Sequence, residues 1–414
     1  MTAGMGRAQR RVRVLGALAV AASCSVVFVG AAQPAAADTQ SKQWYLSAMQ
    51  AEEMWKVTTG EGIKVAVIDT GVNSSTPSLR GQVLKGVDVT GAPGDETDDY
   101  RGHGTTMAEL IAGTGEEGGL KGLAPGAKII PIRMSDADLM KKRSTIFSDS
   151  ADAIRAAADS DAQIISMSFG SEGREISEHE AVEYAESKGK LFLASVGNEG
   201  DRENTRSYPG SYTEAVGVAS ADRKGKVSYY SSHSDAVDIA SPGSDVPGWC
   251  DNNFKSYCDG DGGTSAATAI ASASAALVWS LHPDWTANQV LNVLFDTAGR
   301  DWKKGETSNY LGHGLIRPSM NVLKGKGDPG DPDISPLTKE RTTGPADPSK
   351  KPDASTSASP QPAKNGAEGD KPVAAEETKS SGDESQLGLI LGVAAAVVVL
   401  GGVAYAVVRR RRAA

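Results

Sequence analysis

The central part of the sequence alternates short apolar runs with longer stretches of helical periodicity. The apolar runs are rich in Val and Ile and continuous instead of alternating, which is typical of strands buried on both faces. They lie at 63–68, 128–132, 163–167, 190–196, 215–219 and 237–240. Helices are predicted between them, at 105–112, 149–159, 177–188, 264–281 and 286–295. This alternation predicts an α/β domain with a mostly parallel central sheet flanked by helices.

The N-terminal end departs from this pattern. Residues 1–13 carry four arginines and no acid, an apolar run at 14–29 follows, and three alanines at 35–37 precede Asp38. A charged start, an apolar middle and a small-residue exit predict a secretory signal peptide over residues 1–37. The alternative is an uncleaved anchor, which the short apolar run disfavours.

The C-terminal end predicts a membrane anchor. Residues 387–408 form an uncharged run long enough to cross a bilayer as one helix, and four arginines follow at 409–412. Arginines beside a span favour the cytoplasmic side, so residues 409–414 are expected to form a basic cytoplasmic tail. We therefore expect a single-pass protein of the cell membrane whose main domain is extracytoplasmic.

Residues 328–386 differ in composition from the segments on either side. They contain nine of the 19 prolines and no aromatic residue. Such a segment buries too little apolar surface to offset its ordering entropy, so a disordered, Pro-rich linker is predicted, with an end-to-end distance of roughly 40 Å. The folded domain is accordingly expected at residues 38–327, a length that suits one α/β domain.

Charge and cysteine content restrict the possible functions. The chain has 43 Lys+Arg and 52 Asp+Glu, a net charge of −9 that argues against nucleic-acid partners. After signal removal only Cys250 and Cys258 remain, and in an exported protein they predict a disulfide that closes a small surface loop. Two thiols without a nearby His make only half a zinc site, so no metal is predicted. The acidic stretch 95–99 could hold a structural calcium ion or form a solvated loop; nothing in the sequence supports the calcium ion.

Three short motifs carry candidate chemistry. Asp69 ends a predicted strand, His103 lies between two glycines at a helix start, and Ser265 begins a helix of small residues. A serine hydroxyl needs an imidazole base to act as a nucleophile, and the imidazole needs a carboxylate to orient it. Taken singly, the serine could be only a helix cap and the histidine only a turn residue. Strand and helix ends are nevertheless where α/β folds gather functional groups.

The order Asp69, His103, Ser265, together with Gly197-Asn198, resembles the subtilase family of serine peptidases. The resemblance implies a subtilisin-like three-layer fold and peptide hydrolysis by an Asp-His-Ser triad without a cofactor. It also implies that the Asn198 side-chain amide and the Ser265 N–H form the oxyanion hole. The substrate is then expected to be a polypeptide.

The same resemblance implies where the substrate binds. The segment Ser166-Met167-Ser168-Phe169-Gly170 is similar to the family's strand that pairs with extended substrate, which makes Ser168, Phe169 and Gly170 candidate contacts. Tyr208 and Pro209, in Ser207-Tyr208-Pro209-Gly210, resemble the wall of the pocket for the residue preceding the cut.

Two further segments narrow the resemblance to one branch. Residues 43–62 and 122–127 resemble mycosins, which are membrane-anchored actinobacterial peptidases associated with type VII secretion. This resemblance implies that the protein works with type VII secretion machinery. The alternative is a structural component of a secretion complex whose peptidase activity is secondary.

Overall fold

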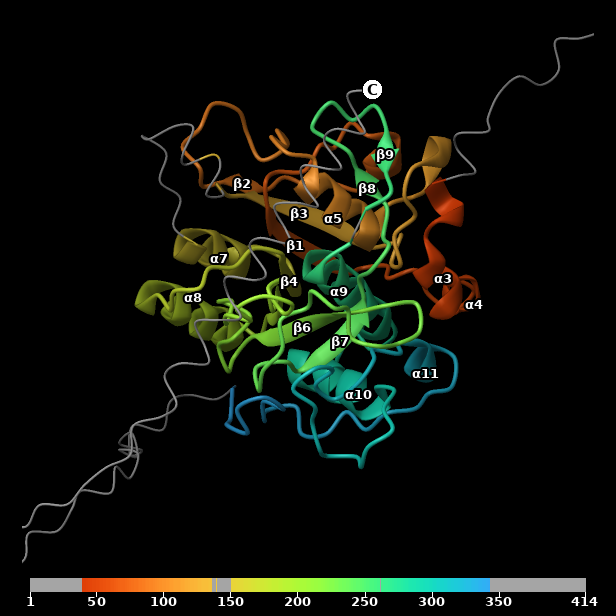
Figure 1. Cartoon of the computed structure of the whole chain (residues 1–414), viewed down its shortest axis with the longest axis vertical. Coiled ribbons are helices and arrows are strands. Elements are labelled where there is room, and N and C mark those ends of the chain that lie inside the picture. The colour runs from red at the N-terminus through yellow and green to blue at the C-terminus, as the bar shows by residue number, and fades with distance from the viewer. Residues whose placement is uncertain (1–38, 136–138, 140–149, 261, 343–414) are drawn as a thin grey trace, which may run out of the picture. The chain divides into compact units, whose positions relative to one another are not determined.

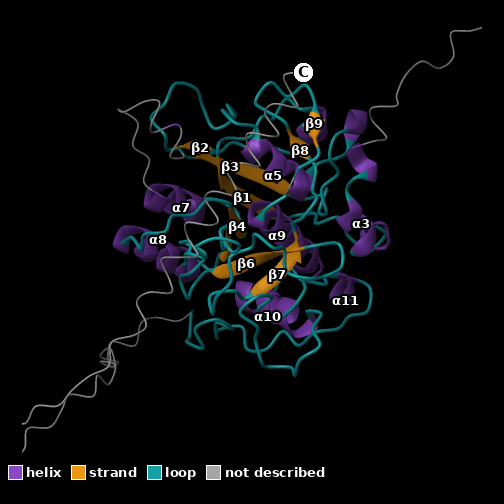
Figure 2. Ribbon diagram, viewed as in Figure 1, coloured by secondary structure: helices purple, strands orange, loops and turns teal. Residues whose placement is uncertain are grey.

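The computed structural model describes residues 39–135, 139, 150–260 and 262–342. Within these residues, seven strands form a parallel sheet in the order β2-β3-β1-β4-β5-β6-β7 (Figures 1 and 2). The sheet strands are β1 (Lys64–Asp69), β2 (Val87–Asp88), β3 (Lys128–Arg133), β4 (Ile164–Met167), β5 (Leu191–Ser195), β6 (Val216–Ala221) and β7 (Ile239–Pro242). A separate antiparallel hairpin consists of β8 (Gly248–Trp249) and β9 (Tyr257–Cys258).

The described helices lie before, between and after these strands along the chain. The α-helices are α3 (Trp44–Ala48), α4 (Ala51–Met54), α5 (His103–Ala112), α7 (Ser150–Asp159), α8 (Ile176–Ser187), α9 (Thr264–Leu281), α10 (Ala287–Thr297) and α11 (Ser319–Val322). Two short 3₁₀ helices, η1 (Pro77–Leu79) and η2 (Glu116–Gly118), complete the set.

The predicted α/β architecture is confirmed. The six predicted strands correspond to β1 and β3–β7, and the five predicted helices to α5 and α7–α10, with ends shifted by at most two residues. Strands β2, β8 and β9 were not predicted, since two residues are too few to show a periodic pattern. Helices α3, α4 and α11 were also missed, because helices of four or five residues span little more than one turn and show no helical periodicity.

The sheet is covered on both faces, which makes the domain three-layered. Successive residues of a strand point to opposite faces, and in β1 Val65 and Val67 join the apolar layer of α5 and α9. Ala66 and Ile68 join the opposite layer, formed by α7 and α8 (Figure 2). This double burial is the reason the strands read as continuous apolar runs in the sequence.

Helix α9 is the core helix of its layer. It packs against α5 and against strands β4–β7, and its many Ala, Ser and Thr residues allow this close approach. Within the part of the chain that the structure describes, α9 is the one helix long and apolar enough to cross a membrane, and 83% of it is buried inside the domain. The predicted signal peptide (1–37), transmembrane helix (387–408) and basic tail (409–414) lie outside the described residues.

The expected start of the linker, residue 328, is wrong, because the fold continues to at least residue 342. Residues 328–342 run along α10, where Asn292 Nδ2 donates to the Pro329 carbonyl at 3.1 Å and Asn288 Nδ2 to the Pro332 carbonyl at 3.0 Å. Leu337 packs against the main apolar layer. These residues lack the composition of a core, but side chains of α10 satisfy their backbone groups. The remainder of the predicted linker, 343–386, lies outside the described residues.

We expect a chain ending after residue 327 to be less stable than one ending after residue 342. The shorter chain loses the Leu337 contacts and several hydrogen bonds to α10, together on the order of 2 kcal/mol. Thermal unfolding of the two truncated proteins measures the difference, and Leu337→Ala in the full chain should reproduce part of it. Equal melting temperatures for all forms would show that the segment contributes nothing.

Candidate active site

The first part of the site is a hydrogen bond between Asp69 and His103. Asp69 is the last residue of β1 and is fully buried, while His103 is the first residue of α5. His103 Nδ1 lies 2.7 Å from Asp69 Oδ1. Because a carboxylate oxygen accepts, Nδ1 carries the proton and Nε2 is left with a free lone pair, as a general base requires. The two residues predicted to pair from their motifs are therefore brought together.

A second carboxylate, Asp99, organises the segments that carry these two residues. Its Oδ1 accepts from the Thr70 hydroxyl at 2.7 Å and the Gly102 N–H at 2.8 Å. Its Oδ2 accepts from the Thr105 N–H at 2.8 Å and the Thr105 hydroxyl at 2.7 Å. Asp99 thus ties the residue after Asp69 to the first turn of α5. The expectation of a solvated acidic loop fails at this position, since Asp99 is buried.

Glycine at position 104 has a packing role. A Cβ atom there would overlap the Gly71 carbonyl oxygen and approach the Asp69 side chain to 3.0 Å. Only a residue without a side chain lets α5 begin this close to the end of β1. The glycine thereby brings His103 to Asp69.

Ser265 shares a cavity with His103 without a hydrogen bond between them. It is the second residue of α9, and both side chains line a cavity of about 360 Å³ together with Asn198 and Trp249. The Ser265 hydroxyl donates to the Ser168 carbonyl at 3.2 Å. The predicted hydroxyl–imidazole contact is therefore not made in this structure. Rotation about the Cα–Cβ bond would redirect the hydroxyl, and such contacts commonly tighten only when substrate binds.

Asn198 is held so that its amide nitrogen can donate. It follows β5, and its Oδ1 accepts from the Thr264 N–H at 2.9 Å and the Thr264 hydroxyl at 3.1 Å. An N–H can only point at an oxygen, so this contact fixes which end of the amide is Nδ2. The Nδ2 group then faces the start of α9, 3.6 Å from where a Cβ at Gly263 would lie. The Ser265 N–H, in the first turn of α9, has no carbonyl within the helix to bond to. The two predicted oxyanion donors therefore lie at the same helix start.

The candidate substrate-binding residues lie in two adjoining segments. Ser168, Phe169 and Gly170 follow β4, and the Phe169 ring stacks on the His103 ring with centroids 5.8 Å apart. Tyr208 and Ser171 exchange two backbone hydrogen bonds, of 2.8 and 2.9 Å, which join the second segment to the first. Pro209, next to Tyr208, is buried. The structure thus joins the two candidate segments, and Ser168 and Phe169 contact Ser265 and His103.

The carboxylates around His103 shift its pKa. Burial lowers the pKa of His103, but the adjacent Asp69, through its charge and its hydrogen bond, and then Asp99 raise it. The net pKa lies above the usual value of 6.5. Only neutral His103 can accept a proton, so any reaction that uses it as a base declines as the pH falls through this raised pKa.

The predicted disulfide between Cys250 and Cys258 is present. It closes the hairpin of β8 and β9, and this hairpin borders the cavity through Trp249. The loop is therefore more than a surface feature, because it forms one wall of the space beside His103 and Ser265.

A buried glutamate attaches this hairpin to α5. Glu109 Oε2 accepts from the Tyr257 hydroxyl at 2.8 Å, and Oε1 accepts from the Thr76 hydroxyl at 2.8 Å. Burial raises the pKa of Glu109 to about 7, and these hydrogen bonds offset the effect only in part. Sequence reasoning missed both Glu109 and Asp99. Glu109 could have been noticed as the one acid in an apolar helix, whereas Asp99 gives no such signal among its acidic neighbours.

The chain is similar in sequence and in structure to known proteins. The subtilase family model matches residues 60–314. Thermitase of Thermoactinomyces vulgaris is 33% identical over 279 residues, covering 65% of this chain and 95% of thermitase. Subtilisin BL of Lederbergia lenta is 32% identical over 279 residues, covering 67% of this chain and 97% of subtilisin BL. The chain also resembles the solved structure of MycP1, with a TM-score of 0.56 and 27% sequence identity. The match covers 67% of this chain and 88% of the MycP1 chain. MycP1 is described as a serine protease and an essential component of the type VII (ESX-1) secretion system.

We expect Asp99→Asn to lower kcat/KM for peptide hydrolysis by about tenfold or more, because the amide brings a donor to face Thr105 and loosens the start of α5. Loss of the Asp99 charge should also lower the pKa of His103 and move the acidic limb of the pH–rate profile to lower pH. Asp95→Asn, an exposed change of the same charge in the same loop, is the control and should leave both unchanged. An unmoved acidic limb in Asp99→Asn would contradict the electrostatic role.

Glu109→Gln tests the buried link to the hairpin. The folded-state pKa of Glu109, about 7, exceeds the ordinary value of 4.5, so the contribution of its protonated form is complete below pH 4.5 and lost as the pH rises through 7. Gln does not titrate. We therefore expect the stability of Glu109→Gln relative to the parent to increase by on the order of 3 kcal/mol between pH 4.5 and pH 8.

Denaturant unfolding at a series of pH values, in a Ser265→Ala background that prevents self-digestion, measures this difference. Glu116→Gln, which changes an exposed acid, is the control and should give a nearly constant difference. A constant difference for Glu109→Gln as well would refute the raised pKa.

Proposed function

The chain belongs to the subtilase family of serine peptidases, and on this basis we propose that it is a membrane-anchored endopeptidase that cleaves polypeptides outside the cytoplasmic membrane. The observation that carries the proposal is the 2.7 Å contact between Asp69 and His103 in a site that they share with Ser265 and Asn198. A carboxylate, an imidazole, a hydroxyl and an amide donor form the set that acyl transfer requires.

In the proposed reaction, Ser265 attacks the carbonyl carbon of the scissile peptide bond. Its hydroxyl proton passes to His103 Nε2, and the buried Asp69 carboxylate stabilises the resulting imidazolium. His103 then returns this proton to the leaving amine as the C–N bond breaks, which leaves an acyl-enzyme on Ser265. Water then attacks the ester with His103 again as the base. His103 returns the proton to the serine oxygen as the ester bond breaks, which regenerates Ser265 and releases the acyl part as a carboxylate.

The negative charge that develops on the carbonyl oxygen needs donors that are already in place. We assign this role to Asn198 Nδ2 and the Ser265 N–H, with the positive end of the α9 dipole behind them. Thr264 contributes indirectly, since its N–H and hydroxyl hold Asn198 Oδ1 and prevent the amide from turning over. Donors fixed before the reaction need no reorganisation during it, which is why such groups lower the barrier.

The substrate is proposed to lie extended beside residues 168–170. In an extended pairing, backbone groups of the enzyme bind any sequence and pockets select side chains. In this structure the Ser168 carbonyl accepts a hydrogen bond from the Ser265 hydroxyl. A substrate bound at this carbonyl would displace the hydroxyl and turn it towards His103. Tyr208 and Pro209 are assigned to the neighbouring pocket.

The location rests on the sequence. A signal peptide over 1–37, a span at 387–408 and the arginines at 409–412 favour the same orientation, with the peptidase domain outside. We further propose a role with type VII secretion machinery. It is supported by the mycosin-like segments 43–62 and 122–127 and by the fold similarity to MycP1.

Substitution of Ser265 tests the catalytic proposal. We expect Ser265→Ala to abolish peptide hydrolysis and labelling by a phosphonate probe, because the Ser265 hydroxyl is the nucleophile of the proposed reaction. Asn198→Ala should reduce kcat by about 10²–10³ with little change in KM, the range that the loss of one oxyanion donor has in subtilisin itself. Ser177→Ala, an exposed serine on α8, is the control.

A membrane-impermeant phosphonate applied to intact cells tests the location of the active site. Labelling of the parent but not of Ser265→Ala would support an external active site, and labelling only after lysis would refute it.

Secretion by a deletion strain tests whether proteolysis is needed. If Ser265→Ala fully restores secretion in this strain, the result favours a structural role in the secretion complex over a proteolytic one.

A further inference from the structure

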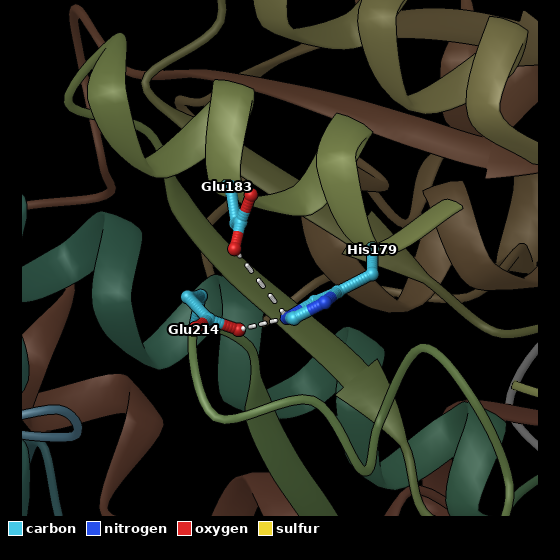
Figure 3. Close-up of side chains that lie close together, drawn as sticks. All are labelled: His179, Glu183 and Glu214. Carbon is cyan, nitrogen blue, oxygen red and sulfur yellow. Dashed lines mark hydrogen bonds and ion pairs between the residues drawn. The ribbon is translucent and has the colours of Figure 1, made fainter. Parts of the chain in front are cut away.

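Three side chains with metal-ligating atoms meet on the surface formed by α8 and the loop before β6. His179 and Glu183 lie one turn apart on α8, and Glu214 comes from the loop that precedes β6. All three point towards one another, as Figure 3 shows. Across the described parts of the chain, this is the group of three such residues whose ligand atoms lie within 4.8 Å of one another. None of these residues belongs to the proposed catalytic set.

The distances between the ligand atoms suit a small ion. His179 Nε2 lies 2.9 Å from Glu214 Oε2 and 3.9 Å from Glu183 Oε1. Zn²⁺ binds nitrogen and oxygen at about 2.0 Å, so ligand atoms at the corners of a tetrahedron lie about 3.3 Å apart. The two observed distances bracket this value, and shifts of about half an ångström would admit the ion.

The imidazole is held in place by groups that are not ligands. Its ring stacks on the ring of Tyr212 with centroids 4.5 Å apart and planes 16° apart. Tyr212 is fixed in turn, because its hydroxyl accepts from the Glu175 N–H at 3.1 Å and donates to the Glu175 carbonyl at 2.9 Å. The Glu214 side chain is 14% exposed and the Glu183 side chain 54%, so the site is anchored on one side and open to water on the other.

We propose that His179, Glu183 and Glu214 bind one Zn²⁺ or a similar divalent transition-metal ion, with water as the remaining ligand. One imidazole and two carboxylates favour this class over Ca²⁺, which prefers a shell of oxygen atoms alone. The ion would join α8 to the loop that runs from Tyr208 to β6, and the ring of Tyr208 lies 4.9 Å from that of Tyr212. Its role is to fix this loop, and it takes no part in peptide hydrolysis.

Arg174 gives the proposal a test of its geometry. Arg174 donates to His179 Nδ1 at 3.1 Å, so in the metal-free protein Nδ1 is the acceptor and the Nε2–H donates to Glu214. A metal at Nε2 requires that the proton move to Nδ1, where the Arg174 guanidinium, a donor only, opposes it. Arg174 is exposed and can turn away, but it competes with the metal. In Arg174→Gln, the side-chain oxygen could instead accept from Nδ1–H.

Equilibrium dialysis of the full-length protein against Zn²⁺, in the Ser265→Ala background, is the experiment. We expect one bound ion per chain, binding at least about tenfold weaker in His179→Ala and in the near-isosteric Glu214→Gln, and binding several-fold tighter in Arg174→Gln. His233→Ala is the matched control, since His233 also stacks on a tyrosine, Tyr310, at 4.5 Å but lies outside the group. Zn²⁺ should also raise the melting temperature of the parent more than that of Glu214→Gln.

Each result decides the proposal without reference to peptidase activity. Failure of the parent to bind one Zn²⁺, or binding that survives unchanged in both His179→Ala and Glu214→Gln, would overturn the site. Weaker binding in Arg174→Gln would overturn coordination through Nε2. Because Arg174 lies on the surface, its variant keeps the test decisive even if His179→Ala fails to fold.

Discussion

The site depends on one hydrogen bond formed away from water, between Asp69 Oδ1 and His103 Nδ1. A fully buried carboxylate is costly unless its charge is compensated, and here the imidazole and the Thr70 N–H supply donors at 2.7 and 2.8 Å. The bond sets the tautomer of His103 and raises its pKa. It also requires β1 and α5 to meet at close range, which explains the glycine at 104 and the five hydrogen bonds that Asp99 accepts.

The parallel sheet supplies the remaining groups. Strands β1, β4 and β5 are neighbours and run in the same direction, so their carboxyl ends meet at one edge. Asp69, Ser168 and Asn198 come from these three ends, although long helical connections separate them along the chain. Helix α9 packs against one face of the sheet and begins at the same edge, which brings Ser265 and its N–H to Asn198. A buried sheet of this kind gives the reacting groups a rigid support.

Segments beside this support are attached by side chains instead of strands. Glu109 and the disulfide hold the β8–β9 hairpin as a wall of the cavity, and residues 328–342 are held by the amides of α10. The proposed ion at His179 would do the same for the loop that carries Tyr208. In each case side chains hold a segment that has few apolar residues of its own.

The sequence alone determined the α/β architecture, the order of the motifs and the disulfide pair. Burial on both faces of a strand, turn glycines and two remaining cysteines can each be recognised directly in the amino-acid sequence. It identified the four residues of the site, which are Asp69, His103, Ser265 and Asn198. It did not identify Asp99 or Glu109, because the sequence does not show whether an acidic side chain is solvated or accepts hydrogen bonds from other parts of the protein. It also placed the end of the domain too early, because residues 328–342 are ordered by α10 and not by their own composition. Only the tertiary structure decided which polar groups face each other, and that depends on contacts between segments far apart along the chain.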